Sequence, residues 1–426
     1  MQNKEYHVGK GTSITILVVL SLLQLVDWAD RSILSIALQS IKQTFNLTDT
    51  QAGMLPSLLQ LGIAVMVVPV AMFADRWARR KMIAIMSVVW STFTLFTGLG
   101  TQLWHLLVSR FMVGAGESGY APAGQTWLGV IFPKSMRSRV FGVFTMFNPI
   151  GVAIGLIVGG VLISATHDWR VPFYVFAIPG FLLAVWVFFL PDYRADKQPG
   201  EALFSKSYFK GWGEVFRIKS WWCATIAQIF TLFMFFGVNS WVPTLLLRAY
   251  NIDTAQVGIT LGLLGFLYLV GPFGGFLADK WLQRNKNGRV IFCIIVGVLI
   301  CAVAIVAWSL VGIPFYSWLA IYAVLAMLMA FAQPVNQSLI HDVVPVGVRA
   351  TAFGTHTLIA QLFGGMLGPV AVGAISDRLG GGTQGIQGGL IVASLVFLLG
   401  AIMLVIMTRY YPADSARVND AVLAEK

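Results

Sequence analysis

Long apolar stretches alternate with short polar segments along almost the whole chain of 426 residues. A helix needs roughly 20 apolar residues to cross the ~30 Å hydrocarbon core of a bilayer. Stretches of about this length or more recur at 12–43, 52–74, 82–101, 102–130, 138–165, 171–190, 220–248, 255–278, 289–311, 315–343, 350–376 and 386–411. The pattern predicts an all-α membrane protein with twelve transmembrane helices, which leaves almost nothing for a soluble domain.

The longest polar segment between two predicted spans, 191–219, divides the chain into two parts of six spans each. We therefore expect an N-terminal six-helix bundle over 1–190 and a cytoplasmic linker over 191–219. A C-terminal six-helix bundle with a short cytoplasmic tail is expected over 220–426.

Short motifs recur between these two parts. Phe45-Asn46-Leu47 with Gln51 and Gly53 recurs, 205 residues later, as Tyr250-Asn251-Ile252 with Gln256 and Gly258. At an offset of 212, Pro122, Gln125, Pro133, Arg137, Phe141, Gly142 and Thr145 recur as Pro334, Gln337, Pro345, Arg349, Phe353, Gly354 and Thr357. A two-fold repeat of six-helix bundles is typical of secondary transporters built from parallel repeats, with a substrate site near the bilayer midplane.

Composition and charge agree with a membrane protein. Of all residues, 57% are hydrophobic and 11% are charged, against about 25% charged in an average soluble domain. If the amino terminus is cytoplasmic, 23 of the 29 Lys and Arg residues fall on the cytoplasmic side, as basic residues in short loops do. We expect both termini in the cytoplasm of a multi-pass protein of the bacterial plasma (inner) membrane. The net charge of +11 is then a topology signal and not a sign of nucleic-acid binding.

Cysteine and histidine give no sign of a metal site, a cofactor or an enzyme. The three cysteines, Cys223, Cys293 and Cys301, lie within predicted spans and imply no disulfide framework. The five histidines are scattered, without the spacing of metal ligands that an intramembrane enzyme would need. A channel is the other alternative, but a gated pore does not usually require two pseudo-symmetric bundles.

Ionisable residues inside two spans are the candidate functional chemistry. Asp30 and Arg31 lie in the first span, and Arg110 and Glu117 lie in the fourth. A charge at the bilayer centre costs at least about 2.5–3.5 kcal/mol, so such residues are expected to face a partner or a water-filled path. At the repeat offsets these positions correspond to apolar or aromatic residues. The predicted site therefore has one charged wall, while its other wall is apolar and aromatic, with candidates Phe235, Phe236, Asn239, Trp241, Tyr322, Gln333, Asn336 and Gln361.

Helix geometry suggests partners for these groups. Asp27 lies one turn before Arg31, a spacing that permits an ion pair within the helix. Arg110 and Glu117 share a face but lie roughly 10 Å apart along the axis. We expect Asp30, Arg31 and Arg110 at a similar depth in the outer half of the membrane, with Glu117 deeper. Our hypothesis is that Asp30 offsets Arg110 or Arg31 when no substrate is bound, while Glu117 is the deeper proton carrier.

The loop after the second span reads Ala71-Met-Phe-Ala-Asp75-Arg76-Trp-Ala78-Arg79-Arg80-Lys81, and Asp279-Lys280 followed by Arg284 is its counterpart in the second half. This pattern resembles the signature of the major facilitator superfamily. The resemblance implies the fold of that superfamily. It also implies a conformational latch formed by Asp75, Arg76, Arg79, Arg80, Asp279, Lys280 and Arg284. Alanine replaces both usual glycines of the first copy, at positions 71 and 78.

The residues from Arg110 to Pro122 resemble helix 4 of two groups in that superfamily, the anion:cation symporters and the Spinster-like lipid transporters. The resemblance implies proton coupling and binding of an acidic headgroup by Asp30, Arg31, Arg110 and Glu117. Arginine in a low-dielectric cavity binds carboxylate or phosphate bidentately. Two functions stay open: proton-coupled transport of a small organic anion such as a sugar acid, and transport of a lysolipid or sphingoid-type amphiphile.

We assign the residues of the two halves to these roles as follows. The substrate-binding set is Arg31, Arg110, Tyr322, Asn239, Gln333, Asn336 and Gln361, and the proton-coupling set is Asp30, Glu117 and Asp27. The expected partners are the anion or amphiphile, the proton and the membrane lipid, and the fold implies a functional monomer.

Overall fold

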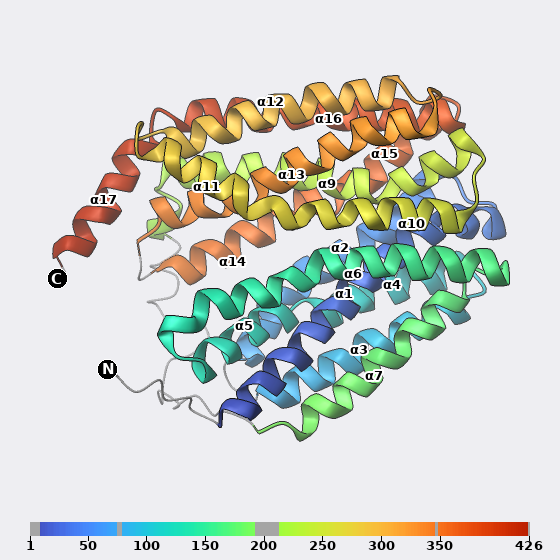
Figure 1. The fold of residues 1–426 in the computed structure, drawn as a ribbon, viewed down its shortest axis with the longest axis horizontal. Coiled ribbons are helices and arrows are strands. Elements are labelled where there is room, and N and C mark those ends of the chain that lie inside the picture. The colour runs from blue at the N-terminus through green and yellow to red at the C-terminus, as the bar shows by residue number, and fades with distance from the viewer. Residues whose placement is uncertain (1–8, 75–78, 192–212, 346–347, 425–426) are drawn as a thin grey trace. The chain divides into compact units, whose positions relative to one another are not determined.

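The computed structural model describes residues 9–74, 79–191, 213–345 and 348–424. Nearly all of these residues are helical, and no β-strand occurs in the described ranges (Figure 1). The fold class predicted from the hydrophobic pattern is therefore confirmed.

The helices of the first half are long and mostly apolar. They are α1 (Lys10–Phe45), α2 (Asp49–Ala74), α3 (Arg79–Leu99), α4 (Leu103–Glu117), α5 (Tyr120–Ile131), the short 3₁₀ helix η1 (Lys134–Met136), α6 (Arg137–Thr166) and α7 (Val171–Phe189). Helix α1 packs mainly against α6, and α3 packs against α7 and α4.

The second half contains more interrupted helices. They are α9 (Lys219–Tyr250), α10 (Thr254–Gly265), η2 (Phe266–Val270), α11 (Gly271–Leu282), α12 (Gly288–Ser309), α13 (Phe315–Val343), α14 (Arg349–Ala360), the π-helical turn η4 (Gln361–Gly365), α15 (Leu367–Arg378), α16 (Gly382–Met407) and α17 (Tyr411–Ala424). Helix α16 packs against α9, α12 and α15.

Eleven helical segments among the described residues are long and apolar enough to cross a membrane. The one remaining predicted span, the fourth along the chain, covers 102–130 and is divided into α4 and α5. Two other predicted spans, 255–278 and 350–376, contain a short 3₁₀ or π-helical turn but continue as one segment. The twelve-span prediction thus holds, with one span built from two shorter helices.

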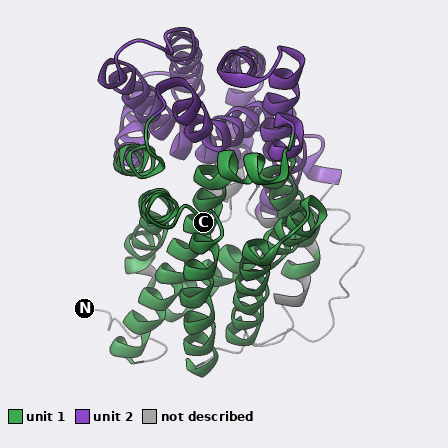
Figure 2. Cartoon of the chain, turned by 90° about the vertical axis from the view of Figure 1, so that its right-hand side faces the viewer, with its two compact units in different colours: residues 1–47, 54–199, 252–266 green, residues 48–53, 200–251, 267–426 purple. Residues whose placement is uncertain are grey.

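The chain forms two compact units that do not coincide with its two halves (Figure 2). Unit 1 contains residues 1–47, 54–199 and 252–266, and unit 2 contains 48–53, 200–251 and 267–426. The first turn of α2 therefore belongs to unit 2, and α10 belongs to unit 1. The boundaries at 190 and 220 predicted from the sequence do not indicate that these two segments belong to the other unit.

The repeated asparagines end two equivalent helices. Asn46 follows α1 with φ 51°, and Asn251 follows α9 with φ 48°. Both are left-handed conformations at a helix C-terminus, which asparagine tolerates better than most residues do. The first sequence repeat is therefore a helix stop followed by a helix start.

Candidate functional site

The fourth predicted span is interrupted next to Glu117. Helix α4 ends at Glu117, and α5 begins at Tyr120. Gly119 lies so close to α2 that an added Cβ would overlap the Val70 side chain. Glycine is required by this approach, and the interruption places the Glu117 side chain at the end of a helix inside unit 1.

Helix α1 carries three buried or partly buried ionisable residues, Asp27, Asp30 and Arg31, within little more than one turn. Helix α6 packs against the same part of α1 through Gly151 and Gly155, where an added Cβ would overlap the α1 backbone. Small residues permit such close helix packing in membranes. The ionisable side chains of α1 find their partners on α3 and α4.

Arg110 and Asp30 form a fully enclosed ion pair. Arg110 Nη1 lies 3.0 Å from Asp30 Oδ2, and both side chains are buried, with 0% and 2% exposure. Arg110 Nε and Nη2 donate to Thr97 Oγ1 at 3.1 and 2.7 Å, and Thr94 donates to Asp30 Oδ1 at 3.0 Å. The guanidinium also lies 5.2 Å from the Phe173 ring centroid. In this conformation the pair is neutral, well supported and closed to a ligand.

Arg31 is shared by two carboxylates. Its Nη2 atom lies 3.0 Å from Asp27 Oδ1 and 2.9 Å from Glu117 Oε2. The side chains of Asp27 and Glu117 are 5% and 0% exposed, whereas that of Arg31 is 17% exposed. Neither Glu117 oxygen accepts a hydrogen bond, and Arg31 Nε donates none, among the described residues. This cluster can bind an anion at the guanidinium and a proton at either carboxyl.

These contacts bear on three expectations. Our hypothesis gives the anion to Arg31 or Arg110 and the proton to the deeper Glu117, whereas the structure brings the side chains of Arg31 and Glu117 into contact. The rise along each helix axis separates the two backbones but ignores the reach of the long arginine side chain. Asp30 pairs with Arg110, one of the two partners considered, and the Asp27–Arg31 pair forms as the spacing allowed.

Thr94 and Thr97 are polar members of the site that the sequence interpretation missed. Both project from α3 toward the Asp30–Arg110 pair. The available signal was two threonines three residues apart, hence on one face of an apolar helix. That signal is weak, because threonine in a span can bond its own backbone, as Thr97 also does to Phe93 at 2.9 Å.

The polar candidates in unit 2 do not form one group. Gln333 and Asn336 line a pocket between α9, α12, α13 and α16. Asn239 instead donates to the Phe235 carbonyl at 2.8 Å, and Tyr322 stacks on Trp318 with ring centroids 5.2 Å apart. Gln361 opens the π-helical turn. None of these last three lines the pocket.

The predicted latch is described only in part. Asp75 and Arg76 lie outside the described residues, and Arg79 begins α3. Arg80 Nη1 donates to the Leu190 carbonyl at 3.1 Å. The latch assignment therefore stays a prediction for this half.

In the second half, Asp279 pairs with a residue that was not predicted, Arg289, at 2.7 Å. Arg289 also pairs with Asp342 at 2.6 Å, and the Tyr411 hydroxyl donates to Asp342 at 2.6 Å. Lys280 and Arg284 form no ion pair within the described ranges. The two signature bases follow the acid in sequence, but a base from the next helix reaches it.

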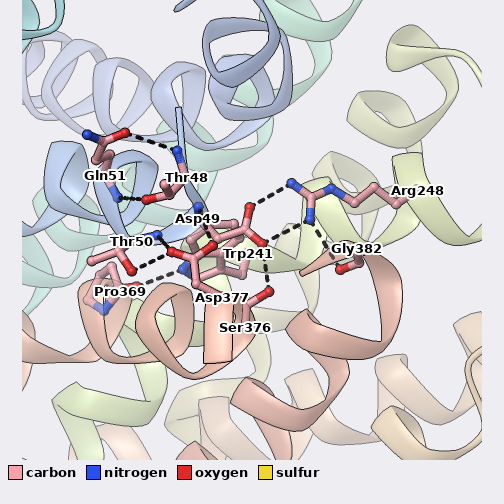
Figure 3. A network of polar contacts seen from close by, with 10 residues as sticks. All are labelled: Thr48, Asp49, Thr50, Gln51, Trp241, Arg248, Pro369, Ser376, Asp377 and Gly382. Carbon is pink, nitrogen blue, oxygen red and sulfur yellow. Dashed lines mark hydrogen bonds and ion pairs between the residues drawn. The ribbon is translucent and has the colours of Figure 1, made fainter. Parts of the chain in front are cut away.

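A second buried network holds the start of α2 within unit 2 (Figure 3). Arg248 Nη2 and Nη1 contact the two Asp49 carboxylate oxygens at 2.9 and 3.2 Å, and the Ser376 hydroxyl donates to Asp49 at 2.6 Å. The Asp377 carboxylate accepts hydrogen bonds from the backbone of Asp49 and Thr50 at 2.9 and 2.7 Å. The sequence interpretation did not identify this network.

No group of three or more His, Cys, Asp or Glu side chains that could hold a metal occurs in the part of the chain that the structure describes. The ionisable cluster in unit 1 consists of guanidinium and carboxyl groups, whose chemistry is anion binding and proton exchange.

Comparison with known proteins identifies the family. The sequence model described as Major Facilitator Superfamily matches residues 20–369. The protein belongs to the Major Facilitator Superfamily. The superfamily resemblance found in the loop motifs is thereby confirmed.

Relatives of this chain include a transporter named for hexuronates and one named for sphingosine-1-phosphate. The chain is 26% identical to the hexuronate transporter of Bacillus subtilis, covering 90% of this chain and 94% of the relative. It is 24% identical to the mouse sphingosine-1-phosphate transporter SPNS2, covering 95% of this chain and 78% of the relative. The structure of a bacterial homologue of the human lysosomal transporter Spinster superposes with a TM-score of 0.83 at 21% identity, over 96% of this chain and 99% of that one. The protein is thus a multi-pass membrane transporter and not an enzyme.

Proposed function

We propose that the protein is a proton-coupled secondary active transporter of a small organic anion, such as a sugar acid or another carboxylate. The observation that carries the proposal is Arg31, whose side chain is 17% exposed and whose guanidinium contacts the buried carboxyls of Asp27 and Glu117. Arginine presents a planar fork of donors that matches a carboxylate. A substrate carboxylate would therefore bind at Arg31.

Coupling follows from the cost of an unpaired buried charge. When an anion takes Arg31, the carboxylates of Asp27 and Glu117 lose their cation. A buried carboxylate without a partner is costly, and protonation removes that cost. Anion and proton therefore bind together. The sequence assigned Arg110 to substrate binding and Asp30 to proton coupling. Because the two side chains enclose each other, we propose instead that they hold α1, α3 and α4 in register.

The remaining assignments are part of the same proposal. Arg31 holds the anionic group. The substrate-binding roles assigned from the sequence to Tyr322, Asn239, Gln333, Asn336 and Gln361 stay part of the proposal. The relative from Bacillus subtilis is named for hexuronates, which are sugar acids. We place the protein in a bacterial plasma membrane as a symporter and a functional monomer, with both termini in the cytoplasm.

Proteoliposomes with an imposed pH gradient and a clamped membrane potential test this function. With radiolabelled glucuronate, the wild type should accumulate substrate in response to the gradient. Arg31→Gln should lose binding and transport together. The double variant Asp27→Asn/Glu117→Gln keeps Arg31 and should equilibrate substrate without accumulating it. Accumulation by this double variant would contradict proton coupling at the cluster.

A second candidate function is transport of a lysolipid or sphingoid-type amphiphile with an acidic headgroup. The pocket in unit 2 favours it, because most of its lining is apolar, with Cys293, Gly297 and Phe397 among the residues on its walls. An added Cβ at Gly297 would meet the Phe397 ring at 3.8 Å, an ordinary contact, so a larger side chain would extend into the pocket. If sphingosine-1-phosphate or lysophosphatidylglycerol is the substrate, Gly297→Leu should impair its transport. Glucuronate transport should be reduced less by this variant, because glucuronate is smaller than the amphiphile.

A further inference from the structure

One arginine nitrogen holds two acids in unit 1. Arg31 Nη2 lies 3.0 Å from Asp27 Oδ1 and 2.9 Å from Glu117 Oε2. The two carboxyl oxygens are therefore no more than about 6 Å apart, a distance at which like charges oppose each other's ionisation. Both acids contact the same guanidinium nitrogen of Arg31.

The charges around the cluster do not balance when both acids are ionised. The Asp30–Arg110 pair on α1 and α4 is neutral by itself. The contacts from α3 are threonine hydroxyls, and α5 contributes Tyr120, whose hydroxyl donates to the Leu20 carbonyl. Helix α7 contributes the uncharged Phe173 ring, and α6 packs through glycine. Two carboxylates and one guanidinium thus leave one net negative charge.

Burial makes that excess charge costly. The Glu117 side chain is fully buried, and neither of its oxygens accepts a hydrogen bond among the described residues. Asp27, by contrast, accepts from Arg31 at 3.0 and 3.4 Å. An unbalanced charge in such surroundings costs several kcal/mol, which one bound proton removes.

We propose that Asp27 is a second proton acceptor of the transport site, interchangeable with Glu117, and that the substrate-free cluster keeps one proton shared between them. This inference rests on the proposed function. A monoanion bound at Arg31 releases both carboxyls from the cation, so a second proton enters with the anion. Because either acid can balance Arg31 by itself, one of them suffices to couple proton to anion.

The two single variants give the decisive measurement. Asp27→Asn or Glu117→Gln leaves one acid with Arg31, and that acid must still take a proton when the anion binds. Each single variant should transport glucuronate more slowly than the wild type. Under a gradient of one pH unit at zero membrane potential, each should still reach the same final accumulation, about tenfold for one proton per anion.

Other outcomes separate this inference from the proposed function. If Glu117→Gln equilibrates glucuronate while Asp27→Asn accumulates it, Glu117 alone carries the proton, and the interchangeable role is wrong. The reverse pattern assigns the proton to Asp27 alone and also contradicts the interchangeable role of the two acids. In both cases the proposed function stands, since accumulation by the double variant would contradict it and neither single-variant pattern does. Glucuronate exchange at equal pH on both sides shows that each variant is folded and able to turn over.

Infrared spectroscopy tests the shared proton without any substrate. The carbonyl stretch of a protonated carboxylic acid should be present in the wild type at neutral pH. It should disappear in Asp27→Asn and in Glu117→Gln, because each leaves one acid balanced by one arginine. Asp168→Asn removes an exposed carboxylate, 42% accessible, and is the matched control that should keep the band. Persistence of the band in Asp27→Asn would overturn the inference, since Glu117 would then be protonated without Asp27.

Discussion

Two arginines of the same bundle have opposite surroundings. Arg110 is enclosed by Asp30, the Thr97 hydroxyl and the Phe173 ring, and Thr94 donates to Asp30. The Arg31 side chain is partly exposed, and its guanidinium lies 5.0 Å from the Trp28 ring centroid. Replacing Arg110 should therefore mainly lower the stability of the protein, whereas replacing Arg31 should mainly weaken ligand binding.

Replacing Arg110 by methionine should destabilise the protein by about 3–5 kcal/mol, because Asp30 is left buried without its cation. Thermal or denaturant-induced unfolding in detergent measures this loss. Arg110→Met combined with Asp30→Asn removes the orphaned charge and should recover most of the stability. Wild-type stability in the single variant would show that the pair contributes nothing.

At this scale the sequence identified the ionisable residues but not all their partners. Charges inside apolar spans are rare and conspicuous, so Asp30, Arg31, Arg110 and Glu117 were found. The rise along a helix predicts depth, but the rotation of one helix against another is set by packing. Glycines in α6 set that packing for α1, and sequence alone does not show which neighbour they contact.

Two equivalent helix starts are secured in different ways. The start of α2 relies on the buried pair of Asp49 and Arg248 and on Asp377. The start of α10 relies on Asp253, an exposed N-cap that accepts from the Ser164 hydroxyl at 2.7 Å. Hydrogen bonds to the Asp253 carboxylate, chiefly the one from Ser164, hold the pKa of Asp253 below its usual value. The contribution of Asp253 is therefore present at neutral pH and lost on acidification through the lowered pKa.

Arg248→Met should cost about 3–5 kcal/mol, since it leaves the carboxylate of Asp49 buried without its cation. Asp253→Asn is the matched control at the other helix start and should cost at most about 1 kcal/mol, because asparagine also caps helices. Unfolding in detergent measures both, and hydrogen exchange should show faster opening of 48–53 in the Arg248 variant only. Equal effects of the two substitutions would contradict the distinction.

Element by element, hydropathy predicted the spans well and their interruptions poorly. The fourth span is divided at Ser118 and Gly119, where Gly119 closely approaches Val70. A hydropathy average over about twenty residues does not register such a contact. The repeat motif did mark a helix stop, but its cause, the left-handed asparagine, became visible only with the backbone angles.

At the scale of the whole molecule, charge is distributed unequally across the membrane-spanning helices. The ionisable cluster lies in unit 1, whereas the pocket of unit 2 is lined mainly by apolar side chains. The distribution of basic residues predicts the orientation, because 23 of the 29 Lys and Arg residues are expected on the cytoplasmic side.

That orientation is testable with reporter fusions in a bacterial host. Green fluorescent protein fused after Lys426 should fluoresce, and alkaline phosphatase fused at the same place should be inactive, because the carboxyl terminus is expected in the cytoplasm. The opposite reporter results should appear for fusions after Asn46, in the predicted outer loop. Active phosphatase after Lys426 would reverse the predicted orientation.

The pairing of Asp30 with Arg110 also has a consequence for synthesis. The two residues are 80 positions apart, and ribosomes add about 5–20 residues per second, so Arg110 is made roughly 4 to 16 s after Asp30. During that interval the first span has reached the insertion machinery with an acid whose partner does not yet exist. We expect α1 to complete its entry into lipid only when α4 has been made, so that the two helices leave the translocon as a pair.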